Sequence, residues 1–370
     1  MRTAELDYDF DPALVATEPA HPRDAARLMV VDRARGAIEH ATVLELPRLL
    51  RAGDRLVVNR TSVLRARLLV RDAASGRATE GLLLEPTARA GEWRMLLRQA
   101  KRFDRGARLV LVDHTGRETD DAVELLDRDG EAWVIRLAPG ALGGDVAEML
   151  ERSGHTPLPP YILKARRDAG LSIDDDEDRA EYETVYADRS ARGSVAAPTA
   201  GLHFTDRLLA EIAALGVPSH EVVLHVGAGT FKPVEAEDLR DHPMHTESFR
   251  VPPATIAALA ETRAARGEGR ARLLAVGTTT VRALESLPEI PAGSGSDTCD
   301  AIAGLTNILI APGHRFRHVD AMLTNFHLPR STLLALVGAF MGMDLMREAY
   351  RTAVRERYRF YSYGDAMLIV

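Results

Sequence analysis

The sequence predicts an α/β protein with a three-layer type of core and a small all-β barrel inserted into that core. Strand and helix patterns alternate near both ends of the 370-residue chain, whereas six short alternating runs lie between them. With 46% apolar and only 5% aromatic residues, the chain is expected to bury a large, mainly aliphatic core. We therefore expect residues 1–62 to form the first part of the core, 63–150 the inserted barrel and 151–370 the second part, which carries the polar motifs.

Hydrophobic periodicity defines the individual elements of the first 150 residues. A strand is predicted over 27–31, a short helix over 44–50 and a buried strand over 55–59. Short runs with Gly- and Asp-rich turns between them are typical of a barrel or sandwich. These runs are predicted as strands 64–70, 80–84, 92–97, 108–112, 122–126 and 132–137.

The second half returns to alternating helices and strands. Residues 142–154 predict a helix, 157–160 a rigid Pro-rich loop, and the acidic run 174–178 a solvated loop that would repel phosphate. Residues 288–300 are rich in Gly, Ser and Pro and predict another loop. The remaining patterns predict helices over 205–214, 253–266, 331–342 and 344–358, and strands over 219–226, 272–276 and 306–310.

Cysteine content and hydropathy restrict the setting of the protein. The single cysteine, Cys299, excludes a disulfide framework and a four-thiolate zinc site. The N-terminus has no apolar run typical of a signal peptide, and the longest apolar stretch, 333–343, is too short to span a bilayer. We expect a cytoplasmic protein without a membrane partner.

Basic residues gather locally although the formal net charge is −7. Nucleic-acid binding requires only a local basic face, so this net charge does not exclude it. A strip of basic residues in the barrel region can follow a phosphate backbone or form a solvated hairpin face. A second basic group near the C-terminus alternates with aromatic residues, which can stack on bases or pack inside the protein. The candidate RNA-binding residues are Arg98, Lys101, Arg102, Arg357 and Arg359.

Polar clusters follow the predicted strands of the second half, where an open α/β sheet binds ligands. In residues 276–286 a predicted strand ends and a helix begins, and hydroxyl side chains lie at this point. The N-terminus of such a helix can bind anions. Arg282 and Glu285 can equally form a pair on the helix surface. The glycine loop of 224–233 is superficially similar to that of a Rossmann methyltransferase, but Pro233 argues against a helix starting there.

Two histidines and a carboxylate lie within six residues, at His242, His245 and Glu247. Histidine and glutamate can hold a metal ion, which would indicate a metal-dependent hydrolase. Polar contacts to a substrate and structural hydrogen bonds are the two other interpretations. The segment lacks the spacing of a helical His pair, so no metal site is predicted.

Three long segments together resemble the S-adenosylmethionine:tRNA ribosyltransferase-isomerases of queuosine biosynthesis: residues 196–204, 225–231 and 324–329. The resemblance extends from Asp7 to Ile369. It implies transfer of the ribosyl part of S-adenosylmethionine to 7-aminomethyl-7-deazaguanine at the tRNA wobble position. Rearrangement would give epoxyqueuosine, with adenine and methionine released. The resemblance also implies an inserted β-barrel beside an α/β core and no prosthetic group, and we expect a monomer.

The resemblance suggests roles for the polar residues of these segments. The reaction requires a base beside the sulfonium, an acid for the departing adenine and negative charge near the cation. The candidate catalytic residues are His203, His225, His245, Glu247 and His327. The candidate substrate-binding residues are Thr199, Thr230, Thr278, Thr279, Arg282, Glu285, Asp320, Asn325, Arg330 and Ser331.

Four positions depart from the pattern that the resemblance leads us to expect. Arg60 stands where an aspartate is expected and Arg65 where a proline is expected; Asn307 replaces an aspartate and His314 a tyrosine. Arg60 exchanges a carboxylate for a cation. A non-catalytic RNA-binding paralogue is therefore the alternative hypothesis.

Overall fold

The computed structural model describes residues 1–141, 143, 145–172, 175–227, 234–266, 271–291 and 300–370. Among these residues, nine strands form one mixed sheet whose central strands β12, β3, β14 and β16 run parallel. In spatial order the strands are β15 (Ile302–Thr306), β13 (Glu247–Val251), β12 (Ser219–Leu224), β3 (Arg55–Asn59), β14 (Leu273–Val276), β16 (Ala321–Asn325), β17 (Ala366–Ile369), β1 (Arg27–Asp32) and β2 (Ala37–Thr42).

Hydrophobic side chains cover both faces of this sheet. Along β1, Leu28 and Val30 belong to one core, whereas Met29 and Val31 belong to the other, as strand alternation requires. Helices α1 and α5 pack on the first face, and α6, α8 and α9 contribute to the second core. The α/β class predicted from the sequence is confirmed. The helices are α1 (Leu46–Leu49), α2 (Val146–Ser153), α3 (Pro160–Asp168), α4 (Asp175–Glu181), α5 (Asp206–Ala214), α6 (Pro253–Arg266), α7 (Thr278–Glu285), α8 (Thr332–Met341) and α9 (Met343–Arg355).

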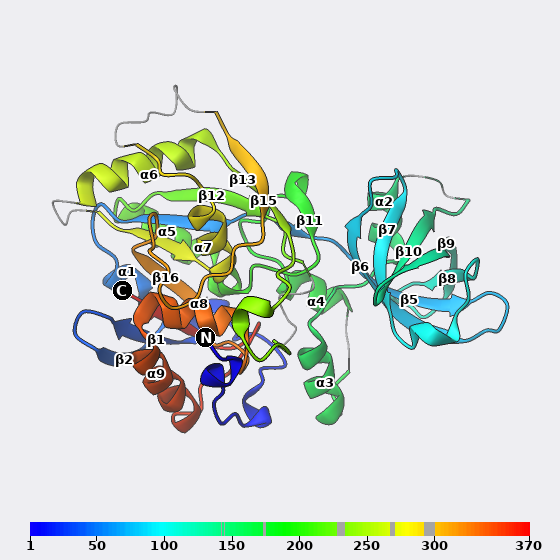
Figure 1. Cartoon of the computed structure of the whole chain (residues 1–370), viewed down its shortest axis with the longest axis horizontal. Coiled ribbons are helices and arrows are strands. Elements are labelled where there is room, and N and C mark those ends of the chain that lie inside the picture. Colours follow the sequence, from blue (N-terminus) through cyan, green and yellow to red (C-terminus); the bar gives the residue numbers. More distant parts are fainter. Residues whose placement is uncertain (142, 144, 173–174, 228–233, 267–270, 292–299) are drawn as a thin grey trace.

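Between β3 and α2 the chain forms antiparallel strands that lie apart from the sheet, at the right of Figure 1. These strands close into a barrel with a hydrophobic interior of its own, which includes Leu68, Met95 and Trp133. The alternation of buried and exposed residues along each strand explains why their sequence pattern is so clear. The strands are β5 (Arg67–Asp72), β6 (Ala78–Pro86), β7 (Glu92–Leu97), β8 (Arg108–Val112), β9 (Glu118–Asp129) and β10 (Ala132–Ala138).

The loop predicted at the acidic run is wrong for its described residues, whereas the predicted exposure to solvent holds for Asp176 and Glu177 and fails for Asp178. Residues 175–178 begin helix α4, and the Asp178 side chain is only 2% exposed. Its carboxylate pairs with Arg166 of α3, at 2.7 Å between Arg166 Nη2 and Asp178 Oδ1. A run of acids appears solvated when its distant cationic partner is not considered.

Several strand predictions also require correction. The strand expected at 306–310 lies earlier in the chain, as β15, where Leu305 is 73% exposed on the edge of the sheet. Strands β2, β13, β16 and β17 were not predicted, although every residue of each pairs with a neighbouring strand. None of the helices in the described ranges is long and apolar enough to cross a bilayer.

Candidate active site

A cavity lies where β14 and β16 end, at the carboxyl edge of the parallel part of the sheet. This is the edge at which open α/β sheets bind ligands. Segments that are far apart in the sequence meet here, because adjacent parallel strands bring their following loops together. The polar groups that line the cavity include Thr199, Thr278, Thr279, Asn325, His327 and Ser331.

Helix α7 presents its N-terminus to this cavity. Gly277, which precedes the helix, has a φ of 91°, a conformation that favours glycine, and no side chain caps the helix in the described structure. The N–H groups of a first helical turn have no partner within the helix, so they are available to a ligand. Thr279 is 6% exposed, and its Oγ1 has no hydrogen-bond partner among the described residues.

Asn325, the last residue of β16, fixes one wall of the cavity. Its Oδ1 accepts a hydrogen bond from Thr199 Oγ1 at 2.9 Å, and its Nδ2 donates to the Tyr361 carbonyl at 3.0 Å. Tyr161 and Ser362 continue this wall through a hydrogen bond of 2.5 Å between their hydroxyl groups. Tyr161, Tyr361 and Ser362 also line the cavity, although no motif in the sequence predicts them there.

His327 is the candidate catalytic histidine that lines this cavity. Its Nε2 lies 2.8 Å from Thr324 Oγ1, and its backbone carbonyl accepts a hydrogen bond from the Tyr8 hydroxyl. Burial lowers the pKa of His327 to about 3. The imidazole is therefore neutral near pH 7, with only about one molecule in ten thousand protonated.

Glu247 and Arg282 form a buried ion pair. Their side chains are 2% and 6% exposed, and Glu247 Oε2 lies 2.5 Å from Arg282 Nη1. Glu247 Oε1 also accepts a hydrogen bond from Gly227 N, just after β12. Within the described ranges, Arg282 Nε and Nη2 are buried without hydrogen-bond partners. Arg282 and Thr279 are three residues apart on α7, so they lie on the same side of the helix. Thr279 lines the cavity, whereas Arg282 and Glu247 are not among its lining residues.

The other candidate histidines lie away from this cavity lining. His203 is buried, with its ring nitrogens 3.1 Å from the Ala200 carbonyl and 2.8 Å from the Gly364 carbonyl. His225 hydrogen-bonds to Thr61 and lines a different pocket, and burial lowers the pKa of both rings. His245 is exposed.

No group of potential metal ligands occurs in the part of the chain that the structure describes. Of the three residues considered for a metal site, His245 is exposed and Glu247 is buried against Arg282. The remaining residue, His242, is half-buried. The three side chains therefore do not make the donor set that a hydrolase would need.

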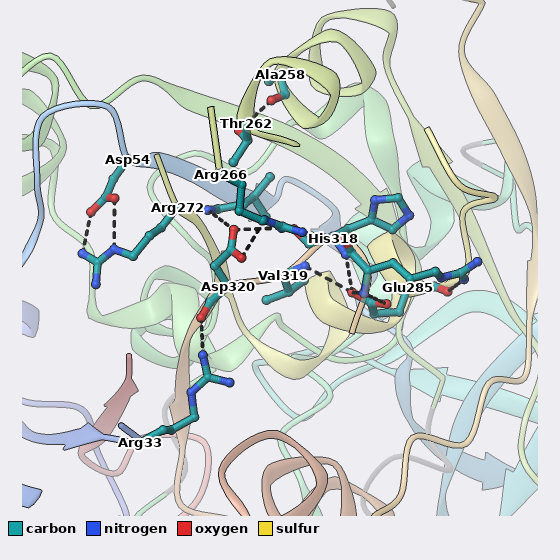
Figure 2. Close-up of polar contacts among 12 residues, drawn as sticks. Arg33, Asp54, Ala258, Thr262, Arg266, Arg272, Glu285, His318, Val319 and Asp320 are labelled. Carbon is teal, nitrogen blue, oxygen red and sulfur yellow. Dashed lines mark hydrogen bonds and ion pairs between the residues drawn. The ribbon is translucent and has the colours of Figure 1, made fainter. Parts of the chain in front are cut away.

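Glu285 and Asp320 have structural partners, as Figure 2 shows. Glu285 is fully buried and accepts hydrogen bonds from the backbone N–H groups of Arg317, His318 and Val319. Asp320 precedes β16, at the amino end of that strand, and pairs with Arg266. Neither residue lines the cavity at the opposite, carboxyl ends.

The remaining candidates have diverse surroundings. Ser331 lines the cavity and caps α8 by accepting a hydrogen bond from Leu334 N, whereas Arg330 is exposed and lines an adjoining hollow. Thr230 lies outside the described residues. Arg98, Lys101 and Arg102 are exposed on the barrel, Arg357 is exposed near Asp11, and Arg359 pairs with Asp365.

The four departures lie outside the cavity lining. Arg60 forms ion pairs with Asp188 and Glu221 in the pocket that contains His225. Arg65 pairs with Glu151 at 2.7 Å, close to the barrel. Asn307 is exposed, and His314 lies 3.4 Å from Glu285.

Comparisons with known proteins identify the family. A family model described as "Queuosine biosynthesis protein" matches residues 3–369. A protein from Symbiobacterium thermophilum named S-adenosylmethionine:tRNA ribosyltransferase-isomerase is 46% identical over 370 residues, which is 100% of both chains. The chain belongs to this ribosyltransferase-isomerase family.

Other members of the ribosyltransferase-isomerase family match equally completely. A Rubrobacter xylanophilus protein of the same name is 46% identical over 100% of this chain and 98% of its own. The crystal structure of S-adenosylmethionine tRNA ribosyltransferase from Thermotoga maritima shares 34% sequence identity and a TM-score of 0.51, covering 99% of this chain and 100% of that one. The resemblance inferred from the motifs is confirmed.

Proposed function

We propose that the protein transfers the ribosyl part of S-adenosylmethionine to 7-aminomethyl-7-deazaguanine at the tRNA wobble position and isomerises it to epoxyqueuosine. Adenine and methionine leave in this reaction. S-adenosylmethionine acts as co-substrate, and the proposal includes no prosthetic group. Membership of the ribosyltransferase-isomerase family over the whole chain supports this reaction.

We assign S-adenosylmethionine to the cavity because the N-terminus of α7 and the end of β16 meet there. The first turn of α7, whose N–H groups have no acceptor within the helix, lines the same cavity as Asn325 and the neutral His327. S-adenosylmethionine offers a carboxylate, ribose hydroxyls and a base, which match an anion-binding helix terminus and an amide. Thr199 and Thr278 complete this polar lining.

We assign proton abstraction beside the sulfonium to His327. A neutral imidazole has a lone pair that can accept a proton. Because the ring is not protonated before the reaction, it does not act as the acid that protonates the departing adenine. In the tautomer that we assign to this role, Nε2–H donates to Thr324 Oγ1, and Nδ1 is the accepting atom.

Arg282 and Glu247 are proposed to organise the charged end of S-adenosylmethionine. Glu247 keeps the guanidinium in place, and the two Arg282 nitrogens that have no partner among the described residues can donate to a carboxylate. Thr279 is one turn earlier on the same helix and supplies a hydroxyl. The methionine carboxylate is the matching ligand group.

We further propose that residues 63–150 form an inserted domain that contacts tRNA. Arg98, Lys101 and Arg102 are exposed there and can bind phosphates. Arg357 and Arg359 form a second candidate contact. The enzyme is proposed to act in the cytoplasm as a monomer.

The alternative of a non-catalytic paralogue is not favoured. The relatives described above carry the enzyme's name and align over the whole chain. The unusual Arg60 is held by Asp188 and Glu221, away from the proposed S-adenosylmethionine site. Its charge therefore gives no reason to expect loss of catalysis.

Replacing Arg60 tests this interpretation. Arg60→Ala is expected to leave turnover within about twofold and to lower the free energy of unfolding by about 1 kcal/mol or less, as is typical of partly exposed ion pairs. Adenine release and urea unfolding measure the two effects. A tenfold loss of turnover would place Arg60 in the catalytic machinery.

Replacing Thr279 tests the binding site. Thr279→Val is expected to raise the KM for S-adenosylmethionine about three- to tenfold, the effect of one lost hydrogen bond. Stability should not fall, because this hydroxyl has no partner in the described structure. Thr280→Val is the matched control, since Thr280 donates to the Val276 carbonyl and does not line the cavity. Equal KM values for both variants would refute the site.

The proposed reaction is tested by incubating the full chain with S-adenosylmethionine and tRNA carrying 7-aminomethyl-7-deazaguanine. Chromatography should show adenine and methionine released in equal amounts. Release of S-adenosylhomocysteine would instead indicate methyl transfer. Retained tRNA binding without any product would support the paralogue.

A further inference from the structure

A second cleft lies beside the barrel, separate from the cavity of the proposed S-adenosylmethionine site. It has a volume of about 480 Å³, within the range of small-molecule sites, roughly 300–1,000 Å³. Its walls come from the start of the barrel segment, from Glu151 of α2, from α4 and from the strand β11 (Arg192–Ser194). In Figure 1, α4 and β11 lie between the barrel and the large sheet.

One side of this junction cleft is rich in arginine. Glu151 accepts ion pairs from both Arg65, at 2.7 Å, and Arg192, at 2.6 Å, so one carboxylate serves two cations. Arg179 also lines the cleft, and its own ion pairs are long, at 3.8 and 3.9 Å. Burial lowers the pKa of Arg65, and the negative charge of Glu151 opposes this shift. Over the whole lining, five arginines outnumber three carboxylates, so the cleft carries excess positive charge: Arg23, Arg65, Arg179, Arg189 and Arg192 against Glu151, Asp176 and Glu183.

Two of these arginines have unused donors. Arg192 Nε and Arg179 Nε are buried, and neither has a hydrogen-bond partner in the ranges that the structure describes. Buried N–H groups without partners are rare in native proteins, because each loses its hydrogen bonds to water without replacement. A phosphate group in the cleft would balance the excess charge and offer acceptors to the guanidinium groups that line it.

The other side of the cleft offers a different chemistry. Glu183 Oε1 is buried without a partner in the described part of the chain, and burial raises the pKa of this carboxyl. Thr184 is 4% exposed, and its Oγ1 also lacks a partner there. The methyl group of Thr184 faces Gly201: a Cβ atom placed on Gly201 would lie only 2.9 Å from Thr184 Cγ2. A carboxylate acceptor and a hydroxyl suit the N–H and carbonyl edge of a nucleobase.

We propose that the junction cleft binds one nucleotide of the tRNA, with its phosphate among Arg65, Arg179 and Arg192 and its base against Glu183 and Thr184. This proposal rests on the proposed function, which makes tRNA the substrate. The position of the cleft supports RNA as the source of the bound nucleotide, because the cleft lies between the barrel and the core and both are proposed to contact tRNA. The site binds a single nucleotide and is distinct from the S-adenosylmethionine cavity.

The test measures the Kd of the full chain for an anticodon stem–loop RNA by fluorescence anisotropy. Thr184→Val replaces an unpartnered hydroxyl with a methyl of similar size, so the fold should be at least as stable. RNA affinity should fall about three- to tenfold, the effect of one lost hydrogen bond. Arg48→Ala is the control, because Arg48 is 82% exposed on α1 and should leave the Kd within twofold.

Arg192→Ala separates a phosphate contact from a structural role. RNA affinity should fall about tenfold, and the slope of log Kd against log salt should decrease by about 0.7–0.9, the contribution of one phosphate contact. Thr184→Val should leave this slope unchanged. If both variants bind the RNA within twofold of the wild type, the proposal is refuted.

A free nucleotide would present the same phosphate and base to the junction cleft as a nucleotide of the tRNA. Guanosine 5′-monophosphate should bind weakly and compete with the RNA; tight binding of this nucleotide without displacement of the RNA would overturn the assignment to tRNA. Adenine release is measured in parallel. Wild-type RNA binding without adenine release refutes the proposed reaction alone, whereas normal release with unchanged variant Kd values refutes the cleft alone.

Discussion

His327→Ala is expected to lower turnover at saturating substrates by a hundredfold or more, the usual contribution of a general base. The imidazole lies in the cavity at the end of β16, and it is neutral near pH 7, so it has a lone pair that can accept a proton. Steady-state release of adenine measures the effect. His225→Ala is the matched control, because His225 is also partly buried but lines another pocket. The turnover of this variant should fall by less than threefold, roughly the effect of lost packing alone.

The pH profile provides a second measure of the same assignment. Because burial lowers the pKa of His327 to about 3, its protonation should cause no fall in rate between pH 8 and pH 6. A His327→Ala enzyme with unchanged turnover would remove this residue from the mechanism. A rate fall that depends on His327 and is centred near pH 6.5 would show that the ring titrates in the usual range.

Glu285→Ala is expected to lower the free energy of unfolding by about 3–5 kcal/mol, since a buried carboxylate with several donors is lost. The backbone N–H groups of Arg317, His318 and Val319 would be left without their acceptor. Urea unfolding measures this change. The expected loss identifies Glu285 as a residue that positions the segment before β16.

Glu285→Gln provides the matched comparison. Its amide oxygen can still accept from part of the segment, so a smaller loss, about 1–3 kcal/mol, is expected. The two variants should keep the same KM for S-adenosylmethionine while they remain folded. A stable Glu285→Ala protein with a strongly raised KM would instead support the substrate contact that the motif first suggested.

The sequence predicts the cavity better than the roles of individual charged residues. Thr199, Thr278, Asn325 and His327 follow strand ends or lie in the motifs, and parallel strands bring such positions together at one edge. Glu285 has the same appearance in sequence, but its partners are backbone groups more than thirty residues away. Local spacing contains no information about such partners.

The fold shows the same division. The barrel strands could be predicted because one face of each strand is buried and the other is solvated, which gives a period of two. Strands β16 and β17 are buried on both faces and have five and four residues, so no alternation marks them. Helix α4 was missed because Asp178 is neutralised by Arg166, a residue of another helix.

The fate of the ribose tests the central claim most directly. S-adenosylmethionine labelled separately in its ribose and in its methyl group is incubated with the enzyme and tRNA carrying 7-aminomethyl-7-deazaguanine, and the wobble nucleoside is analysed by mass spectrometry. The proposed reaction predicts the ribose label in the nucleoside and the methyl label in free methionine. A methyl label in the nucleoside, with the ribose label in S-adenosylhomocysteine, would contradict it.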